Sequence, residues 1–588
     1  MRLVLLARAI LILSLCGIGV SWSEQTPPPE AHAMPSWAQA MLVIREQGAS
    51  FERLSAWCDK VATNTGSVAQ QTIVSALFSI PVQEGTAPKG SAILFLLDTA
   101  EKGPLLEALV LALSDAKVFT TALQTALGAV EKDGLLHVKI PQGFEQPEKL
   151  LVIQIEQQMA WVAPDAAWLA KIRAATLHGA RDDASPEAPD LTLKVNLAVL
   201  RERYQRELVG FMGALEALGT SYFPQAADAL AQAQGTFLRQ TRDLKSMELR
   251  LRFSGDNLDF AADLLAQPGT AWAALWDRQP ATRRAELAAV LPGVAALNFE
   301  AWPHPVKEGT PVVVPKETPR VPEVAPTGHW IEPAMELWKS ADEGALCTLV
   351  SGQDGSVQLV LLLAAQTPAQ TEAAVQEALK GIVGLVSNYA RTQMQLKPEE
   401  PAPYELEALP ETAVKGTQVK GHRVVLAKKY RIFPEIEQAY ARAAEWPVCV
   451  RYAAIKQGVL VAVGKNGAAA LQYAIEQAAQ VAQSKPLAAE TGLTLTVQPM
   501  ALARAYLNVI LNPTLFEAAQ FTDKLEDVPI RIQGGAQRGT ASVRAVLPAQ
   551  ALRGLFEVYL KLDRAGIDPF SFQLPGGSVP APAPPQAP

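Results

Sequence analysis

Two segments of the chain occur twice, and this repetition constrains the fold more than any other feature of the sequence. Residues 191–195 read Leu-Thr-Leu-Lys-Val, and residues 493–497 read Leu-Thr-Leu-Thr-Val. A second match aligns Ile155, Met159 and Trp161 with residues 455, 459 and 461. Self-similarity over so long a separation predicts two tandem copies of one domain.

Each copy is predicted to follow the same order of elements. The sequence predicts an opening helix, a strand pair, a helix, three strands, a helix, the repeated strand with one or two helices after it, and a closing hairpin. In copy one these are a helix at 37–63, strands at 73–80 and 92–97, a helix from about Pro104 to Val130, strands at 135–140, 150–155 and 159–163, a helix at 165–175, the strand at 191–195 and a hairpin at 248–262. In copy two they are a first strand at 294–299, a helix at 331–340, strands at 345–350 and 357–363, a helix at 367–389, strands at 423–427, 448–455 and 459–463, a helix at 467–480, the strand at 493–497 and a hairpin at 530–546 that turns at Gly534-Gly535.

Local patterns support these elements. Residues 248–253 alternate charged and apolar side chains, which is typical of a strand with one packed and one wet face. Thr367-Pro368 is a good helix start, and apolar residues follow it at a spacing of three and four. Because most strands are joined by hairpins and helices come in blocks, the sequence predicts an α+β fold with mostly antiparallel sheets packed with helices.

Proline and polar residues set the predicted domain boundaries. The segments 303–329 and 575–588 carry too many prolines for a helix or a sheet interior. We therefore expect a signal peptide at 1–23, a flexible leader at 24–34, repeat one at 35–285, repeat two at 286–567 with a Pro-rich insertion at 303–329, and a disordered Pro/Ala-rich tail at 568–588.

The first residues predict export. Arg2 and Arg8 give the chain a positive start, and an apolar run follows from Ala9 to Val20. Small residues at 21 and 23 place the cleavage between Ser23 and Glu24. An uncleaved anchor is the alternative, but the run is short for a hydrocarbon core of about 30 Å. A lipid attached at Cys16 is a further alternative, although Leu15 is large for such a motif. We expect a protein that acts in the periplasm or outside the cell.

Three cysteines follow the expected cleavage point, which is too few for a scaffold built on disulfides. Cys347 and Cys449 lie in strand-like apolar segments of copy two, so one bridge between them is a candidate. The alternative is that both are small buried hydrophobic residues. Cys58 would then be left over.

No pattern in the sequence predicts a catalytic, cofactor or metal site. None of the six histidines has a second histidine or a cysteine at zinc-ligand spacing, and His137 and His422 share only a place early in matching strands. The chain has no Gly-x-Ser-x-Gly elbow, and its one loop resembling a phosphate loop has Asn466 where Ser or Thr is required. Trp272 and Trp276 share a predicted helix face, which favours packing over a sugar platform.

Two classes of function remain. The first is an exported, non-enzymatic binding or scaffolding module whose partner is a protein, a peptide or an apolar ligand. A net charge of −7 gives no reason to expect nucleic acid, and no segment after the signal is long and apolar enough for stable membrane insertion. The alternative is a hydrolase with a dispersed active site in one of the two copies. The residues that the copies share are mostly apolar, which favours the first class.

Overall fold

The computed structural model describes most of the predicted core. It describes residues 34–77, 84–97, 106–140, 149–177, 188–199, 243–270, 273, 276, 281–291, 296–302, 331–351, 356–393, 400–427, 447–481, 487–489, 492–509, 521–522 and 524–564. The predicted signal with its cleavage point at Ser23 and Glu24, the leader up to residue 33, the Pro-rich insertion and the tail lie outside the described residues.

The fold is α+β, with helices packed on antiparallel sheet, as the sequence predicts. Contacts divide the chain into two compact units. Unit 1 holds the described residues up to 276 together with Ile532–Ala549 from the far end of the chain. Unit 2 holds the described residues from Ala281 to Arg531 and from Gln550 onward.

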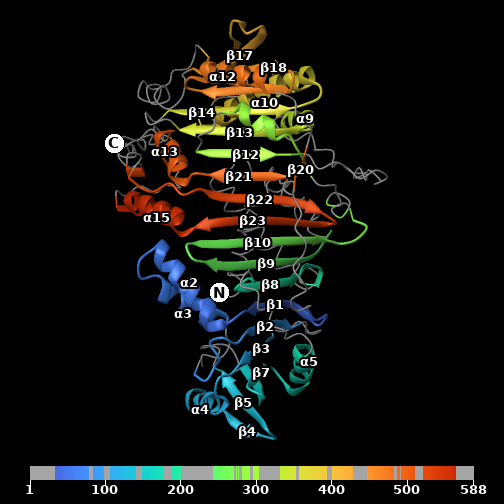
Figure 1. The fold of residues 1–588 in the computed structure, drawn as a ribbon, viewed down its shortest axis with the longest axis vertical. Coiled ribbons are helices and arrows are strands. Elements are labelled where there is room, and N and C mark those ends of the chain that lie inside the picture. Colours follow the sequence, from blue (N-terminus) through green and yellow to red (C-terminus); the bar gives the residue numbers. More distant parts are fainter. Residues whose placement is uncertain are drawn as a thin grey trace, which may run out of the picture. The chain divides into compact units, whose positions relative to one another are not determined.

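Unit 1 is a sheet in which every recorded strand pair is antiparallel (Figure 1). The pairs give the order β4-β5-β6-β7-β3-β2-β1-β8-β9-β10-β23. The strands are β1 (Ala38–Ile44), β2 (Ala92–Leu97), β3 (Glu107–Ala112), β4 (Val130–Lys132), β5 (Leu135–Ile140), β6 (Lys149–Glu156), β7 (Met159–Ala163), β8 (Leu191–Asn196), β9 (Leu244–Ser254), β10 (Asn257–Ala266) and β23 (Thr540–Pro548). The last strand comes from the C-terminal part of the chain and pairs along β10 from Asn257↔Pro548 to Leu265↔Thr540.

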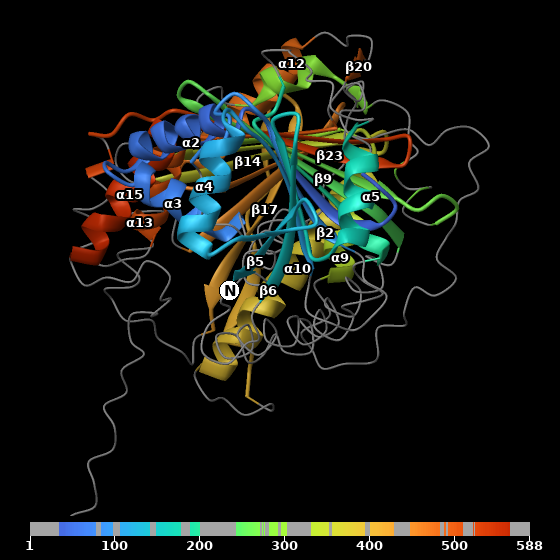
Figure 2. The same cartoon turned by 90° about the horizontal axis from the view of Figure 1, so that it is seen from below.

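Helices cover both faces of this sheet (Figure 2). Helices α2 (Gln47–Val61) and α4 (Ala116–Leu127) lie on one face, and α5 (Ala166–Leu177) lies on the other. A further helix, α3 (Gly66–Leu77), packs on α2. On the first face Phe119 and Leu123 of α4 pack on apolar residues of β5 and β6. On the second face Leu169 and Ile172 of α5 pack on Trp161. Two apolar layers therefore hold the strands between helices.

The strands of unit 2 also pair in the antiparallel direction (Figure 1). Its pairs give the order β15-β17-β18-β19-β14-β13-β12-β21, and β16 also pairs with β17. The strands are β12 (Leu297–Ala301), β13 (Gly344–Ser351), β14 (Val357–Ala364), β15 (Tyr404–Ala408), β16 (Thr412–Val414), β17 (Thr417–Leu426), β18 (Val448–Ile455), β19 (Gly458–Gly464) and β21 (Leu493–Val497). A separate two-stranded pair joins β11 (Ala281–Arg283) to β20 (Leu487–Ala489).

The helices of unit 2 form three packing groups. On one face of the sheet, α9 (Ile331–Ser340) and α10 (Pro368–Gln393) pack through Leu337, Val375 and Leu379. Another apolar layer forms between α12 (Gly467–Gln480) and strands β14 and β19. In the third group, α13 (Pro499–Val509) packs on α15 (Ala549–Arg564).

Three predicted elements of copy one are wrong. Residues 38–44, expected to open a long helix, form β1, because pairing with β2 on one side and β8 on the other outweighs their local pattern. Residues 73–77, expected in a strand, belong to α3. The helix expected from about Pro104 begins only at Ala116, where the Asp115 side chain caps it, and the residues before it form β3.

The closing hairpin of copy two also turns at another place. Gly534 and Gly535, the predicted turn, lie inside β22 (Ile530–Gln537). The turn is at Arg538-Gly539, whose φ values of 51° and 76° fit the two-residue turn of a hairpin. Position 538 has a side chain that carries no sequence signal for positive φ, so the glycine pair was the wrong choice.

Candidate functional site

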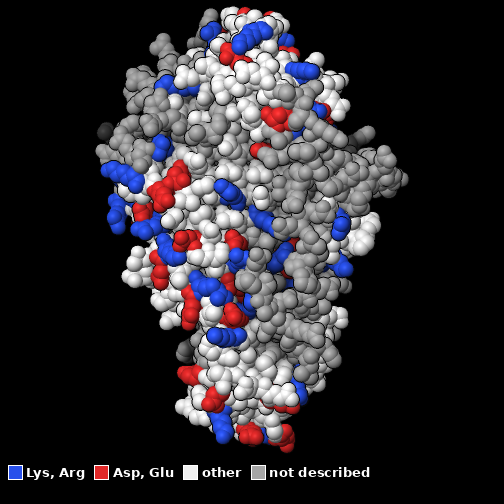
Figure 3. Space-filling view, in the orientation of Figure 1, with Lys and Arg blue, Asp and Glu red and all other residues white. Residues whose placement is uncertain are grey.

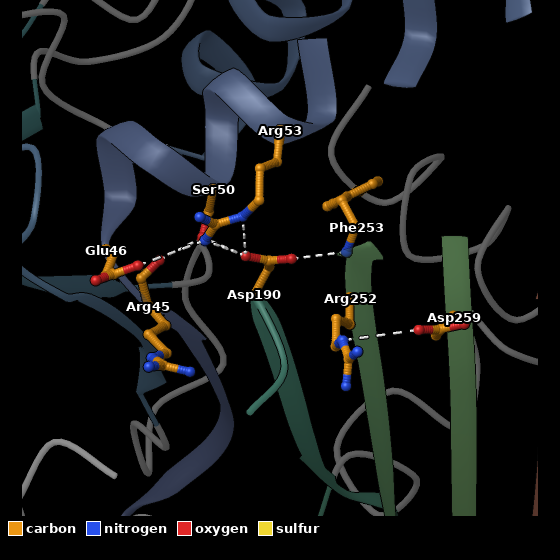
Figure 4. Close-up of polar contacts among 8 residues, drawn as sticks. All are labelled: Arg45, Glu46, Ser50, Arg53, Asp190, Arg252, Phe253 and Asp259. Carbon is orange, nitrogen blue, oxygen red and sulfur yellow. Dashed lines mark hydrogen bonds and ion pairs between the residues drawn. The ribbon is translucent and has the colours of Figure 1, made fainter. Parts of the chain in front are cut away.

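A buried carboxylate organises one polar cluster in unit 1 (Figure 4). Asp190 immediately precedes β8 and is 4% exposed. Its Oδ1 accepts a hydrogen bond from Arg53 Nε at 2.8 Å and lies 3.0 Å from the Ser50 hydroxyl, both on α2. Its Oδ2 accepts from the backbone N–H of Phe253 on β9 at 2.7 Å. One side chain thus joins α2 to the ends of two strands.

The backbone of Asp190 completes the same connection. Its carbonyl accepts from the N–H of Arg45 at 2.9 Å, and its N–H donates to the carbonyl of Leu251 at 2.8 Å. Glu46 lies 3.6 Å from the outer nitrogen of Arg53 (Figure 4). Since the carboxylate has an ion-pair partner and a backbone donor, this arrangement is that of a structural clip.

A second polar cluster lies in unit 2, under α10. Lys420 on β17 and Tyr452 on β18 are ladder partners. The ammonium of Lys420 lies 3.1 Å from Glu372 on α10. The Tyr452 hydroxyl lies 3.4 Å from His422 Nδ1, and the two rings stack with an interplanar angle of 8°. Tyr452 is fully buried, whereas the side chains of Lys420 and Glu372 are 32% and 15% exposed.

The surroundings of this second cluster set its protonation states. The hydrogen bond with Glu372 raises the pKa of Lys420, and the charge of Glu372 adds to the effect. Burial raises the pKa of Tyr452, although a hydrogen bond with Gln376 acts in the opposite direction. Near neutral pH the lysine therefore stays an ammonium and the tyrosine stays a neutral phenol, so neither group can accept a proton as a base.

Unit 1 has apolar side chains at the matching places. Tyr452 lies three residues before the hairpin pair Ile455↔Gly458. Ile153 lies three residues before the pair Glu156↔Met159, and its ladder partner is Leu136. Ile153 and Leu136 are 0% and 6% exposed and belong to the core under α4. The polar cluster is therefore a feature of unit 2 alone among these matched positions.

Charged side chains form a cross-strand row on β8, β9 and β10. Lys194 lies 3.6 Å from Glu248, Arg250 pairs with Asp263, and Arg252 lies 3.7 Å from Asp259. Figure 3 shows Lys and Arg interspersed with Asp and Glu over this part of the surface. Opposite charges across strands stabilise the sheet modestly, and the alternating signs make no single-sign patch for an acidic or basic partner.

The largest run of exposed apolar side chains among the described helices lies on α15. Leu555, Phe556 and Tyr559 are 37%, 39% and 44% exposed. The same helix packs Val558 and Leu562 against Met500 of α13. Gly554 permits this close packing, because a Cβ there would lie 2.9 Å from the Met500 sulfur. This helix therefore has large apolar side chains among its exposed residues as well as toward its own core.

The two cysteines that the sequence offered as a bridge are free thiols. Cys347 lies on β13 and Cys449 on β18, and β14 and β19 lie between those strands. Three strand spacings amount to about 14 Å, whereas a disulfide needs Cα atoms within roughly 7 Å. Burial raises the pKa of Cys347 to about 11, so its thiolate is scarce near neutral pH.

The remaining candidates are also placed. Burial raises the pKa of Cys58 on α2, and Asp59 adds to the effect. His137 is exposed on β5 and pairs with Val152, whereas His422 is partly buried and pairs with Val450. Because Leu136 matches Lys420, the two histidines are one position out of step and point to opposite faces. Within the described ranges no group of three or more His, Cys, Asp or Glu side chains is arranged to hold a metal ion.

Sequence reasoning missed both polar clusters. Their residues come from elements far apart in the chain, so no spacing pattern connects them. A signal was present in the comparison of the copies: Asp190 precedes one repeated strand, and Gly492 precedes the other. Tyr452 was missed because the predicted alignment of the copies was one residue out of step there. The hairpin pairs match Ile155 to Ala454 and not to Ile455.

Comparisons with known proteins add little to this picture. No protein-family model and no curated protein matches the chain. Two solved structures are weakly similar. "Structure of crystal form IV of TP0453" has a TM-score of 0.21 and 10% identity, and it covers 39% of this chain and 76% of that chain. "Structure of crystal form III of TP0453" has a TM-score of 0.20 and 12% identity, and it covers 41% and 79%. Likeness this low carries no argument.

None of the helices in the described part of the chain is long and apolar enough to cross a membrane.

Proposed function

We propose that this chain is an exported, non-enzymatic binding or scaffolding protein built from two copies of one domain. Export is supported by the charged start, the apolar run and the small residues before Glu24. The partner is a protein, a peptide or an apolar ligand that the folded protein binds outside the cytoplasm, in the periplasm or at the cell surface.

Strand pairing supports the duplication. In unit 1, β8 pairs with β1 so that Leu191 faces Ile44 and Val195 faces Ala40. In unit 2, β21 pairs with β12 so that Leu493 faces Ala301 and Val497 faces Leu297. On its other side β1 pairs with β2 through Ile44↔Ala92, and β12 pairs with β13 through Ala301↔Ala345, in the same register. Two unrelated domains have no reason to share both register and strand order.

The observation that carries the binding role is the exposed apolar face of α15. A soluble protein seldom keeps large apolar side chains of one helix in water unless something binds there. Leu555, Phe556 and Tyr559 also include the aromatic side chains that are enriched where proteins bind one another. The two polar clusters, in contrast, are internally paired.

Site-specific photocrosslinking in the exported protein tests this role. A photoreactive residue at position 556 is expected to give discrete adducts with a partner in intact producing cells. The same residue at Ile382, which is 49% exposed on α10, is the matched control and is expected to give few. Equal diffuse labelling at both positions, or none at position 556, contradicts the binding role of α15.

A hydrolase with a dispersed active site in one copy remains the alternative. The observation that favours it is the Glu372, Lys420, His422 and Tyr452 cluster, which has no polar counterpart at Leu136 and Ile153 in unit 1. The raised pKa values of Lys420 and Tyr452 count against it, because they remove two bases. Turnover of an ester, amide or glycoside substrate that Glu372→Gln abolishes and Arg553→Gln leaves intact would establish the alternative.

A further inference from the structure

We propose that Asn466 is a site of spontaneous covalent modification, at which the side-chain amide is lost and a carboxylate forms at the N-terminus of α12. Asn466-Gly467 is the one Asn-Gly dipeptide in the sequence. Asn466 is exposed, and its side chain makes no capping hydrogen bond to α12. The modification does not depend on the binding role of α15.

The reaction joins a backbone nitrogen to the side chain that precedes it. The nitrogen of Gly467 loses its proton and bonds to Cγ of Asn466, the C–N bond of the side-chain amide breaks, and ammonia carries the proton away. Water then opens the succinimide ring at either of its carbonyls and leaves aspartate or isoaspartate. Glycine permits the ring closure because it has no Cβ beside the attacking nitrogen.

The start of α12 favours the attacking nitrogen. Gly467 is the first residue of the helix, so its N–H has no acceptor inside the helix. A Cβ at Gly467 would lie 3.8 Å from Nη1 of Arg451, and Lys465 comes just before the dipeptide. The helix N-terminus and these cations stabilise negative charge, first on the nitrogen and then on the new carboxylate. The first turn of α12 has no acidic side chain of its own.

The fold restrains the reaction through the carbonyl of Asn466. This carbonyl accepts from the N–H of Ala470 at 3.0 Å and from Nε2 of Gln358 at 3.0 Å. At the observed ψ of 16° the Gly467 nitrogen is turned away from the Asn466 side chain, so ψ must rotate before the ring can close. The rotation breaks both hydrogen bonds, and removing one of them should therefore speed the reaction.

Asn64 is a matched control within the same chain. It is also exposed, and its φ of 64° places it in the same left-handed region as Asn466. The residue after it is Thr65, whose branched side chain hinders attack by the backbone nitrogen. The two asparagines are thus alike in exposure and backbone and differ in the residue that follows.

Peptide mapping by mass spectrometry on the folded mature chain tests the modification. After incubation at mildly alkaline pH, the peptide with Asn466 is expected to gain about 1 Da, whereas the peptide with Asn64 keeps its mass. Gly467→Ala is expected to slow the gain at least about tenfold. This variant should fold, because its Cβ would lie 3.7 Å from the nearest neighbouring atom, and circular dichroism checks that it does.

An unchanged mass at Asn466 in the folded chain would overturn the proposal. Equal conversion of Asn64, or conversion at the wild-type rate in Gly467→Ala, would also overturn it, because the following glycine would then not direct the reaction. Gln358→Leu is expected to convert several-fold faster than the wild type. A rate in Gln358→Leu equal to that of the wild type would overturn the restraint by the Asn466 carbonyl.

Discussion

Units 1 and 2 share the register of one set of paired strands and carry different side chains at two corresponding places. In unit 1 the carbonyl of Asp190 accepts from the N–H of Arg45, and in unit 2 the carbonyl of Gly492 accepts from the N–H of Trp302. Of the two acceptor residues, Asp190 has a side chain and Gly492 has none. The Asp190 carboxylate binds Arg53 on α2 and the backbone of β9. Trp302 is instead packed in the apolar core of unit 2. The same backbone hydrogen bond therefore occurs in both units, and different side chains surround it in each.

At the second place, unit 1 is apolar and unit 2 is polar. Unit 1 buries Leu136 against Ile153, while unit 2 puts Lys420 beside Tyr452 and closes the pair with Glu372. A buried polar cluster lowers the stability of a fold unless each of its members has a partner. Apolar side chains of similar size would fill the same place in unit 2 at little or no loss of stability. At this place the core of unit 1 is therefore apolar, whereas unit 2 has a polar cluster.

Splitting the chain after residue 285 is expected to have the largest effect. The N-terminal part would lose β23 and leave the edge of β10 unpaired over the stretch Asn257–Leu265. Unpaired edges of this length promote aggregation. Size exclusion should therefore find the piece 24–285 aggregated.

The control for the split restores the missing strand. A piece 24–285 joined by a flexible linker to residues 530–550 is expected to be monomeric or markedly less aggregated. A soluble, monomeric piece 24–285 with the melting temperature of unit 1 in the whole chain would show that β23 is dispensable.

Placing a lysine at Leu136 in unit 1 and a leucine at Lys420 in unit 2 is expected to have the next largest effect on stability. Leu136→Lys places an ammonium in the core under α4, at a residue that is 6% exposed and whose ladder partner on β4, Glu131, is itself exposed to solvent. It should cost roughly 3–5 kcal/mol in free energy of unfolding, measured by urea denaturation. The reverse change, Lys420→Leu, should cost about 1 kcal/mol, because Glu372 keeps some contact with water. Equal costs would contradict the expectation that the difference in burial and in ionic partners between the two sites governs the loss of stability.

Removing the Asp190 carboxylate should cost somewhat less. Asp190→Ala leaves the N–H of Phe253 and the hydroxyl of Ser50 without this acceptor, and we expect a loss of roughly 2–4 kcal/mol. Arg53→Met should cost about 1 kcal/mol or less, because the arginine side chain is 39% exposed. If both variants lose the same amount in denaturation, the ion pair and not the backbone contact holds the clip.

The sequence predicted elements whose pattern and neighbours agree. Helix α12 was predicted with its observed bounds, and strands β7 and β18 were also correct. It failed for residues 38–44, where an apolar run fits a helix or a strand and distant partners decide. The turn at Arg538-Gly539 was missed because an adjacent glycine pair gave a stronger local signal.

The two polar clusters could not be predicted from the sequence for a different reason. Asp190 and Arg53 are more than a hundred residues apart, and Glu372 meets Lys420 only because α10 packs on β18, the neighbour of β17. The exposed face of α15 was more accessible: residues 552–560 are rich in large apolar side chains, which predicts a helix with an unusually wide apolar arc.

The smallest expected effect is a loss of stability at alkaline pH in unit 2 that unit 1 does not share at the corresponding place. Lys420 and Tyr452 titrate at ordinary pKa values of 10.5 and 10.0 when unfolded, and the fold raises both. A raised folded pKa gives stability that is complete below the unfolded pKa and is lost as pH rises through the folded pKa. Unit 2 should therefore lose stability above about pH 10 through these two groups, whereas Leu136 and Ile153 give unit 1 no such dependence.

Two variants isolate this effect. The difference in melting temperature between wild type and Tyr452→Phe should be constant from pH 7 to about pH 9 and should then shift in favour of the variant as the pH rises further. Lys420→Met should show the same sign, because it also removes a group that the folded state keeps protonated. Leu136→Met in unit 1 is the matched control, and its difference from wild type should not change with pH. A difference that shifts in favour of the wild type above pH 10 would mean that the fold lowers these pKa values, and the polar cluster would then be a source of base after all.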